Sequence, residues 1–65
     1  MNTRIAERIN IGDEFDLFEV PYLVFGARVV QDDKSKVIIR AINMNDESGH
    51  SVTMLVHRKF QFKIK

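Results

Sequence analysis

The chain has 65 residues, of which 45% are hydrophobic and 29% charged, and it contains no cysteine. This composition describes one small domain and excludes a disulfide scaffold, a disordered tail and a multidomain enzyme. The net charge of +1 hides a division, because residues 1–33 carry three basic and seven acidic side chains and residues 34–65 carry seven basic and two acidic ones. Either acidic and basic strands pair across a sheet, or a charged surface meets a partner of opposite charge.

The first ten residues predict a short helix. Asn2 or Thr3 can cap its N-terminus, and Gly12 follows its end. Ile5 and Ile9 lie four residues apart, on the same helical face. A helix of two turns is not stable alone in water, so we expect both isoleucines to pack against the rest of the domain.

No segment predicts export or membrane insertion. The first ten residues lack the continuous apolar core of a secretory signal, and no stretch approaches the roughly 20 apolar residues that cross a bilayer. We therefore expect a cytoplasmic protein with no membrane partner.

From Gly12 onward the sequence has the periodicity of β-strands. We expect strands over residues 14–19, 22–30 and 36–44, and two more within residues 52–64, divided by a short turn at residues 57–59. Gly26 lies inside the second strand, where glycine marks a bend or a bulge. The prediction is a short N-terminal helix over residues 1–10 and a small five-stranded antiparallel barrel, or a bent sheet, over residues 11–65, in a single domain.

The order of these elements resembles that of SH3-like small barrels. The resemblance covers residues 11–65 and consists of an Ile-Gly-Asp-Glu-Phe opening at residues 11–15, a glycine-bent second strand, a hairpin and a short closing strand. With a helix in front, the order is similar to the Sm-like variant, in which subunits join into rings. The spacing from Gly26 to Asp32 is also similar to that variant, whereas the turn at residues 33–36 is longer than its pattern.

More apolar side chains are present than one small core can hold. The strand pattern assigns these residues to the core: Phe15, Leu17, Leu23, Phe25, Val29, Val37, Ile39, Val52, Met54, Val56, Phe60, Phe62 and Ile64. A second set lies out of phase with it: Phe18, Tyr22, Val24, Ile38, Ile42 and Met44. Either the N-terminal helix covers this second set, or the set forms a contact surface for a protein partner or a second copy of the chain.

A basic cluster near the C-terminus offers an alternative site for nucleic acid. It consists of Arg58, Lys59, Lys63 and Lys65. Single-strand binders combine aromatic and basic side chains on one surface, whereas strand alternation places Phe60 and Phe62 on the face opposite Lys63. Any nucleic-acid binding by this cluster is therefore expected to be weak and non-specific.

The sequence gives little support for catalysis or for a bound cofactor. Ser48, Ser51 or Thr53 could combine with His50 or His57, but no strand-turn-helix context surrounds them. Two histidines are too few for a structural zinc site, and the paired carboxylates at residues 32–33 and 46–47 do not have the spacing of a calcium loop. The three glycines are too widely separated for a phosphate loop. We therefore expect that the protein is not an enzyme and that it binds no metal or cofactor.

Together these features favour a non-catalytic protein-interaction module, such as a compact bacterial or phage accessory or inhibitor protein. Such a module would bind a larger protein or assemble with itself. The alternative is a small SH3-like or Sm-like barrel that binds nucleic acid through its basic C-terminal half.

Overall fold

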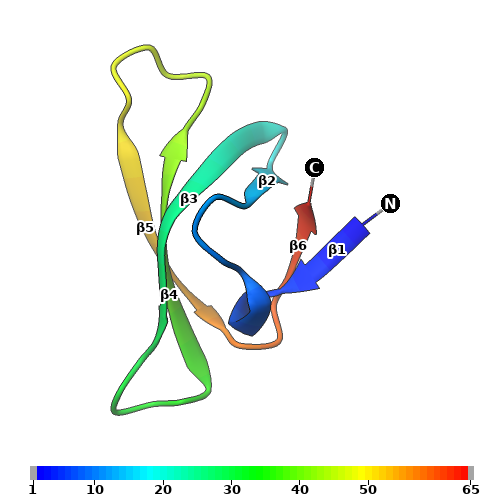
Figure 1. Ribbon diagram of the computed structural model, residues 1–65, viewed down its shortest axis with the longest axis vertical. Helices are drawn as coiled ribbons and strands as arrows, with labels where there is room; N and C mark the ends of the chain where they lie inside the picture. The colour runs from blue at the N-terminus through cyan, green and yellow to red at the C-terminus, as the bar shows by residue number, and fades with distance from the viewer. Residues whose placement is uncertain (1, 65) are drawn as a thin grey trace.

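The computed structural model describes residues 2–64 as a single antiparallel sheet of six strands (Figure 1). The strands follow one another in the order β1-β6-β2-β3-β4-β5 across the sheet. In chain order the elements are β1 (Asn2–Ile5), the 3₁₀ turn η1 (Ala6–Arg8), β2 (Glu14–Leu17), β3 (Val20–Val29), β4 (Lys36–Asn43), β5 (Ser51–His57) and β6 (Gln61–Ile64). The mostly β architecture is therefore confirmed, and no helix within residues 2–64 is long and apolar enough to cross a membrane.

The predicted N-terminal helix is wrong. Asn2–Ile5 forms strand β1, which pairs with β6, and only Ala6–Arg8 turn as a single 3₁₀ segment. Pairing with the edge of β6 stabilises residues 2–5 as a strand, whereas a two-turn helix is not stable on its own in water. Branched residues such as Thr3 also suit a strand. Of the two isoleucines expected to pack against the domain, Ile9 is 4% exposed in the core, whereas Ile5 is only half-buried; Ala6 of η1 is 1% exposed.

The sheet bends around its core without closing into a barrel. Its outer strands are β5, at the left of Figure 1, and β1, at the right, and these two do not pair. Residues from both sides of the bend form one buried cluster together with Ala6 of η1: Ala6, Ile9, Phe15, Val24, Val37, Ile39, Ala41 and Phe62. The aromatic centre is the contact of Phe15 with Phe62, whose ring centroids are 4.5 Å apart.

A bulge in β3 decides which of its residues enter the core. Val24 pairs with Ala41, but the next pair is Gly26 with Arg40, so Phe25 is the extra residue. The predicted irregularity at Gly26 is confirmed. The extra residue reverses the strand alternation, so that Val24 is buried whereas Phe25, expected in the core, is 37% exposed.

Candidate functional site

The structure distributes the six predicted contact residues over several surfaces. Val24 belongs to the core, and the half-buried Tyr22 stacks on Phe15 at 5.5 Å. Ile38 and Ile42 are half-buried on the outer face of β4, and Met44 is exposed in the β4–β5 turn. Phe18 is 92% exposed in the β2–β3 turn. The six residues therefore do not form one surface, and Phe18 is the most exposed of them.

The turn that carries Phe18 has an unusual backbone. Leu17 pairs with Val20, so the hairpin loop consists of Phe18 and Glu19 alone, with φ angles of 50° and 66°. Two positive φ angles in a two-residue loop are typical of a type I′ turn, in which asparagine and glycine are the favoured residues. Phenylalanine and glutamate are held there against their own preference, at a cost of about 1–2 kcal/mol per residue.

Phe18 lines an open groove between this turn and β6. We name it the Phe18 groove; its volume is about 420 Å³ and its lining residues are Asp16, Leu17, Phe18, Glu19, Phe60, Gln61, Phe62 and Lys63. Phe60 is 43% exposed and meets the buried Phe62 edge to face, with centroids 4.9 Å apart. The groove thus has aromatic walls that continue into the core and a polar rim that includes Glu19, Gln61 and Lys63.

The outer face of β3, β4 and β5 is a second distinctive surface. These three strands contain no aspartate or glutamate. Alternation with the buried Val37, Ile39 and Ala41 places the neighbouring residues of β4 on the outer side. We name this surface the basic face, and its residues are Phe25, Gly26, Arg28, Lys36, Ile38, Arg40, Thr53 and Leu55.

Sequence reasoning missed this grouping of an aromatic ring with cations. The Arg40 guanidinium carbon lies 5.3 Å from the centre of the Phe25 ring. The Arg40 side chain lies over Gly26: its Cβ and Cδ would be 3.5 and 3.6 Å from a Cβ added at that glycine, which is ordinary van der Waals contact. A bulge at Gly26 was the one available signal, because only the extra residue turns Phe25 outward beside Arg40.

Two of the residues of the predicted basic cluster lie beside acidic residues. Lys59 Nζ lies 3.3 Å from Glu7 Oε1, and Lys63 is placed opposite Asp16 in the β2–β6 register. Arg58 is exposed in the β5–β6 turn, while Lys65 lies outside the described residues. Phe62 is buried and Lys63 exposed, as the predicted segregation requires, whereas Phe60 is 43% exposed and lines the same groove as Lys63.

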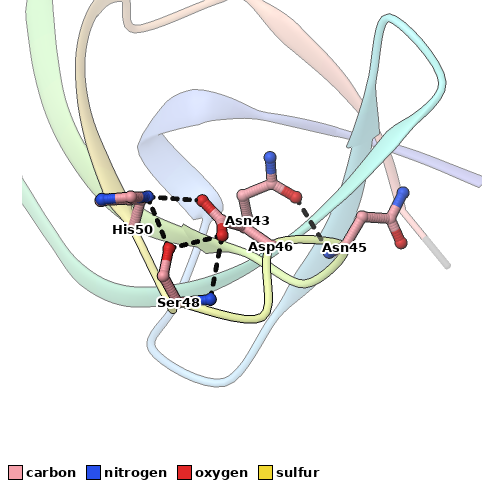
Figure 2. Close-up of polar contacts among 5 residues, drawn as sticks. All are labelled: Asn43, Asn45, Asp46, Ser48 and His50. Atoms are coloured by element: carbon pink, nitrogen blue, oxygen red, sulfur yellow. Dashed lines mark hydrogen bonds and ion pairs between the residues drawn. The ribbon is translucent and has the colours of Figure 1, made fainter.

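A polar cluster in the β4–β5 turn brings together a serine, a histidine and an aspartate (Figure 2). His50 Nδ1 lies 2.6 Å from Asp46 Oδ2 and 2.7 Å from Ser48 Oγ, and Ser48 Oγ donates to Asp46 Oδ1 at 2.6 Å. A Ser-His-Asp relay needs serine and aspartate on opposite ring nitrogens, whereas here both lie at Nδ1. The arrangement is therefore a turn-stabilising network and does not have the geometry of a proton relay.

The same network shifts the acidity of Asp46. Hydrogen bonds from the Ser48 hydroxyl, from His50 and from the Ser48 N–H stabilise the carboxylate and lower the pKa of Asp46 to about 2. The Asn43 side chain accepts a bond from the Asn45 N–H at 2.9 Å on the other side of the turn. Among residues 2–64, no three His, Asp or Glu side chains form a group that could hold a metal ion.

A functional proposal for this chain rests on these surfaces, because the comparisons with known proteins found no match. No protein-family model matches the chain, and no curated protein or solved structure matches it.

Proposed function

We propose that this protein is a non-catalytic protein-interaction module that binds a larger partner protein through the Phe18 groove. The observation that carries the proposal is the β2–β3 turn, where a phenylalanine that is 92% exposed is held at a φ of 50°. A backbone strained in order to present one side chain to solvent is a feature of ligand-contact sites. Asparagine and glycine would build the same turn with less strain, but they would remove the aromatic ring.

The composition of the groove supports a protein ligand. Interfaces concentrate their binding energy in a few aromatic anchors that are surrounded by a polar rim. Phe18 and Phe60 supply the anchors, and Glu19, Gln61 and Lys63 supply the rim. An apolar side chain of the partner would enter between the two rings and rest on Phe62.

We propose the role of a compact accessory or inhibitor protein, of the kind that bacteria and their viruses encode. We further infer an SH3-like arrangement from the strand order. Strands β2 to β5 are neighbours in sequence order, β6 returns beside β2, and β1 is added as a sixth strand.

The test compares capture of a partner by the wild type and by two variants. In the first variant, Phe18→Asn and Glu19→Gly replace the strained turn; in the control, Ile11→Ser removes an apolar side chain that is 72% exposed away from the groove. Each protein is immobilised, and the captured partner is identified by mass spectrometry and titrated by calorimetry. We expect the control to bind as the wild type does and the turn variant to lose binding while remaining folded. Equal affinity of all three would overturn the proposal.

A second function, the binding of single-stranded nucleic acid, is favoured by the basic face. Phe25 lies beside Arg40 and on the same face as Arg28 and Lys36, which is the combination of stacking and phosphate-binding groups that such proteins use. Few phosphates can be reached, so we expect affinity in the non-specific range, with Kd about 10⁻⁴ to 10⁻⁶ M at physiological salt.

Fluorescence anisotropy with single-stranded and duplex oligonucleotides at two salt concentrations tests this second function. Arg28→Glu with Arg40→Glu should abolish binding, whereas Lys63→Glu, on β6, should leave most of it. If both variants lose binding equally, the basic face is not the site. A protein interface that depends on apolar contacts would respond little to salt, which separates the two functions.

A further inference from the structure

Strand β5 is an open edge of the sheet, and it lacks the features that usually protect such an edge. Its seven residues pair with β4 without a register shift, and it contains no proline and no lysine, arginine, aspartate or glutamate. Exposed edges are normally blunted by charges, proline, bulges or short length. The opposite edge, β1, is only four residues long and carries Arg4. Strand β5 therefore offers a longer and less protected edge for backbone pairing than β1 does.

The hydrogen bonds to β4 determine which backbone groups of β5 point outward. Asn43 N–H donates to the His50 carbonyl, and Arg58 N–H donates to the Ser35 carbonyl, at 3.2 and 2.8 Å. In this antiparallel ladder the even-numbered residues of β5 therefore bond to β4. The N–H and C=O groups of Ser51, Thr53 and Leu55 point away from the sheet. So does the His57 N–H, whereas the His57 carbonyl accepts from Phe60 N–H at 2.9 Å.

We propose that a second copy of the chain docks on this edge, pairing β5 with β5 antiparallel about a two-fold axis at Met54. Residues that face each other across a strand pair lie on the same side of the sheet. If the two cores are to lie on one side, odd residues must therefore face odd residues. An axis at Met54 meets this condition with all seven residues paired, placing Thr53 opposite Leu55 of the second copy and Ser51 opposite His57. The two sheets then form one continuous sheet.

The side chains along this seam are compatible with a second copy. Val52, Met54 and Val56 are half-buried on the core side. In the proposed register Val52 faces Val56 of the second copy, and the two Met54 side chains meet at the axis. Apolar cross-strand neighbours of this kind stabilise a sheet, and no two like charges face each other.

The charges at the ends of β5 choose the antiparallel arrangement. The turn before β5 carries Asp46, which is hydrogen-bonded to Ser48 and His50, and Glu47; the turn after it carries Arg58, and Lys59, which is paired with Glu7. The contact between copies therefore depends mainly on Glu47 and Arg58. Antiparallel pairing brings the acidic turn of each copy to the basic turn of the other, and the two-fold axis repeats this contact. Parallel pairing would place acid against acid and base against base. Two copies of β5 therefore have complementary end charges when they pair antiparallel.

This inference goes beyond the proposed function and uses a different surface, since no residue of β5 lines the Phe18 groove. The two proposals can therefore fail separately. The turn variant, Phe18→Asn with Glu19→Gly, should self-associate as the wild type does, whatever happens to its partner binding.

Sedimentation equilibrium at concentrations up to about 1 mM measures the association, because small edge interfaces are weak. Hydrogen exchange of individual amides then locates the interface. We expect exchange at Thr53 and Leu55 to slow by about tenfold or more as the dimer forms, and exchange at Val52 and Met54, already bonded to β4, to be slow throughout. A monomer at the highest concentration, or a dimer in which Thr53 and Leu55 exchange at monomer rates, would overturn the proposal.

Two sets of variants test the register and the charges. Thr53→Pro removes an outward N–H while leaving the β4 ladder intact, and Thr53→Ala keeps that N–H as the matched control. We expect the proline variant to be monomeric and the alanine variant to dimerise. Glu47→Lys or Arg58→Glu alone should weaken the dimer by about tenfold, and the two together should restore it. If the double variant is as weak as either single one, the antiparallel arrangement is wrong.

Discussion

At the scale of single residues, Phe18 and Glu19 are the positions where local preference and observed conformation disagree most. Both have positive φ in a loop that has no other residues. We expect Phe18→Asn with Glu19→Gly to raise the free energy of unfolding by about 1–2 kcal/mol, because the new residues take this conformation with less strain. Phe18 buries little surface, so its removal costs little in the free protein.

Urea unfolding of the turn variant and of the wild type measures this gain. The Ile11→Ser control should unfold at the wild-type midpoint, since it changes exposed apolar surface without changing a strained turn. A turn variant no more stable than the wild type would show that the turn stores no strain. The expected combination, greater stability with lost partner binding, is the trade between stability and function that binding sites show.

Asp46 is expected to make the free energy of unfolding depend on pH in the acidic range. Its pKa is lowered from the ordinary 3.8 to about 2 by Ser48 and His50. A carboxyl group whose pKa is lower in the folded state stabilises the fold above its unfolded pKa, and this stabilisation is lost as the pH falls from about 4 through about 2. The urea midpoint should therefore fall over this range.

Asp46→Asn isolates this contribution from that of the other carboxyl groups. Hydrogen bonds from Ser35 also lower the pKa of Asp33, so the wild type loses stability at low pH for more than one reason. The variant should show a smaller loss between pH 4 and pH 2 than the wild type. Identical pH profiles would mean that the network around Asp46 persists in the unfolded chain or is absent from the folded one.

At the scale of elements, the predicted N-terminal helix and the observed strand β1 with its 3₁₀ turn lead to different expectations for the burial of the two isoleucines. Burial raises the pKa of Asp13, but bonds from Asn10 N–H and from Arg4, 2.7 Å away, lower it below its usual value overall. This contact links β1 to the residue before β2. In a helix, Ile5 and Ile9 would share one face and similar burial, whereas here Ile9 is in the core and Ile5 is only half-buried.

We therefore expect Ile9→Ala to cost about 2–4 kcal/mol of stability and Ile5→Ala distinctly less. Ile11→Ala, at a side chain that is 72% exposed, serves as the control and should change stability by less than about 0.5 kcal/mol. Denaturant unfolding of the three variants decides the matter. Equal losses at Ile5 and Ile9 would favour the helix over β1.

Much of the fold could be predicted from the sequence, because alternation and turn residues act locally. The structure places strands where residues 36–44 and 52–64 predicted them, with the division near His57, and it places a bulge at Gly26. Two features depended on distant contacts. Whether residues 2–5 form a helix or a strand is decided by the free edge of β6, some sixty residues away, and local capping preferences carry no information about that edge.

The candidate sites were harder to predict for a related reason. Strand alternation assigns each residue of β3 to a face only if the position of the extra residue is known. The sequence indicated a bulge near Gly26, but it did not indicate that Phe25 would be the unpaired residue. For this reason Phe25 was assigned to the core and Val24 to the surface. Phe18 could be found as a residue out of phase, whereas its strained conformation required coordinates.

At the scale of the whole molecule, the acidic and basic halves of the sequence meet in space. Lys59 and Glu7 form an ion pair, and Lys63 faces Asp16 in the strand register, whereas the ion pair of Arg4 with Asp13 lies within the acidic half. The pair of Lys59 with Glu7 joins the two halves of the chain across an exposed surface. Pairs of this kind contribute little to stability because water and salt screen them.

We expect Lys59→Ala to change the free energy of unfolding by less than about 0.5 kcal/mol, although it removes the pair with Glu7. Urea unfolding at low and high salt provides the measurement, with Ile9→Ala as the reference for a large loss. A loss above about 1 kcal/mol that disappears in high salt would show that charge pairing between the halves contributes substantially to the fold.

The pairing of β1 with β6 has a consequence for how the chain can be rearranged. Asn2 lies directly opposite Ile64, so the first residue of β1 and the last residue of β6 lie side by side, and Figure 1 shows these two strands next to each other. Neighbouring strands are only about 5 Å apart, a gap that a hairpin loop of a few residues can bridge. A circular permutant that joins these ends and opens the chain within the exposed turn at residues 44–50 would keep every strand pair of the sheet. Its new ends would then lie beside the proposed dimer seam and far along the chain from Phe18.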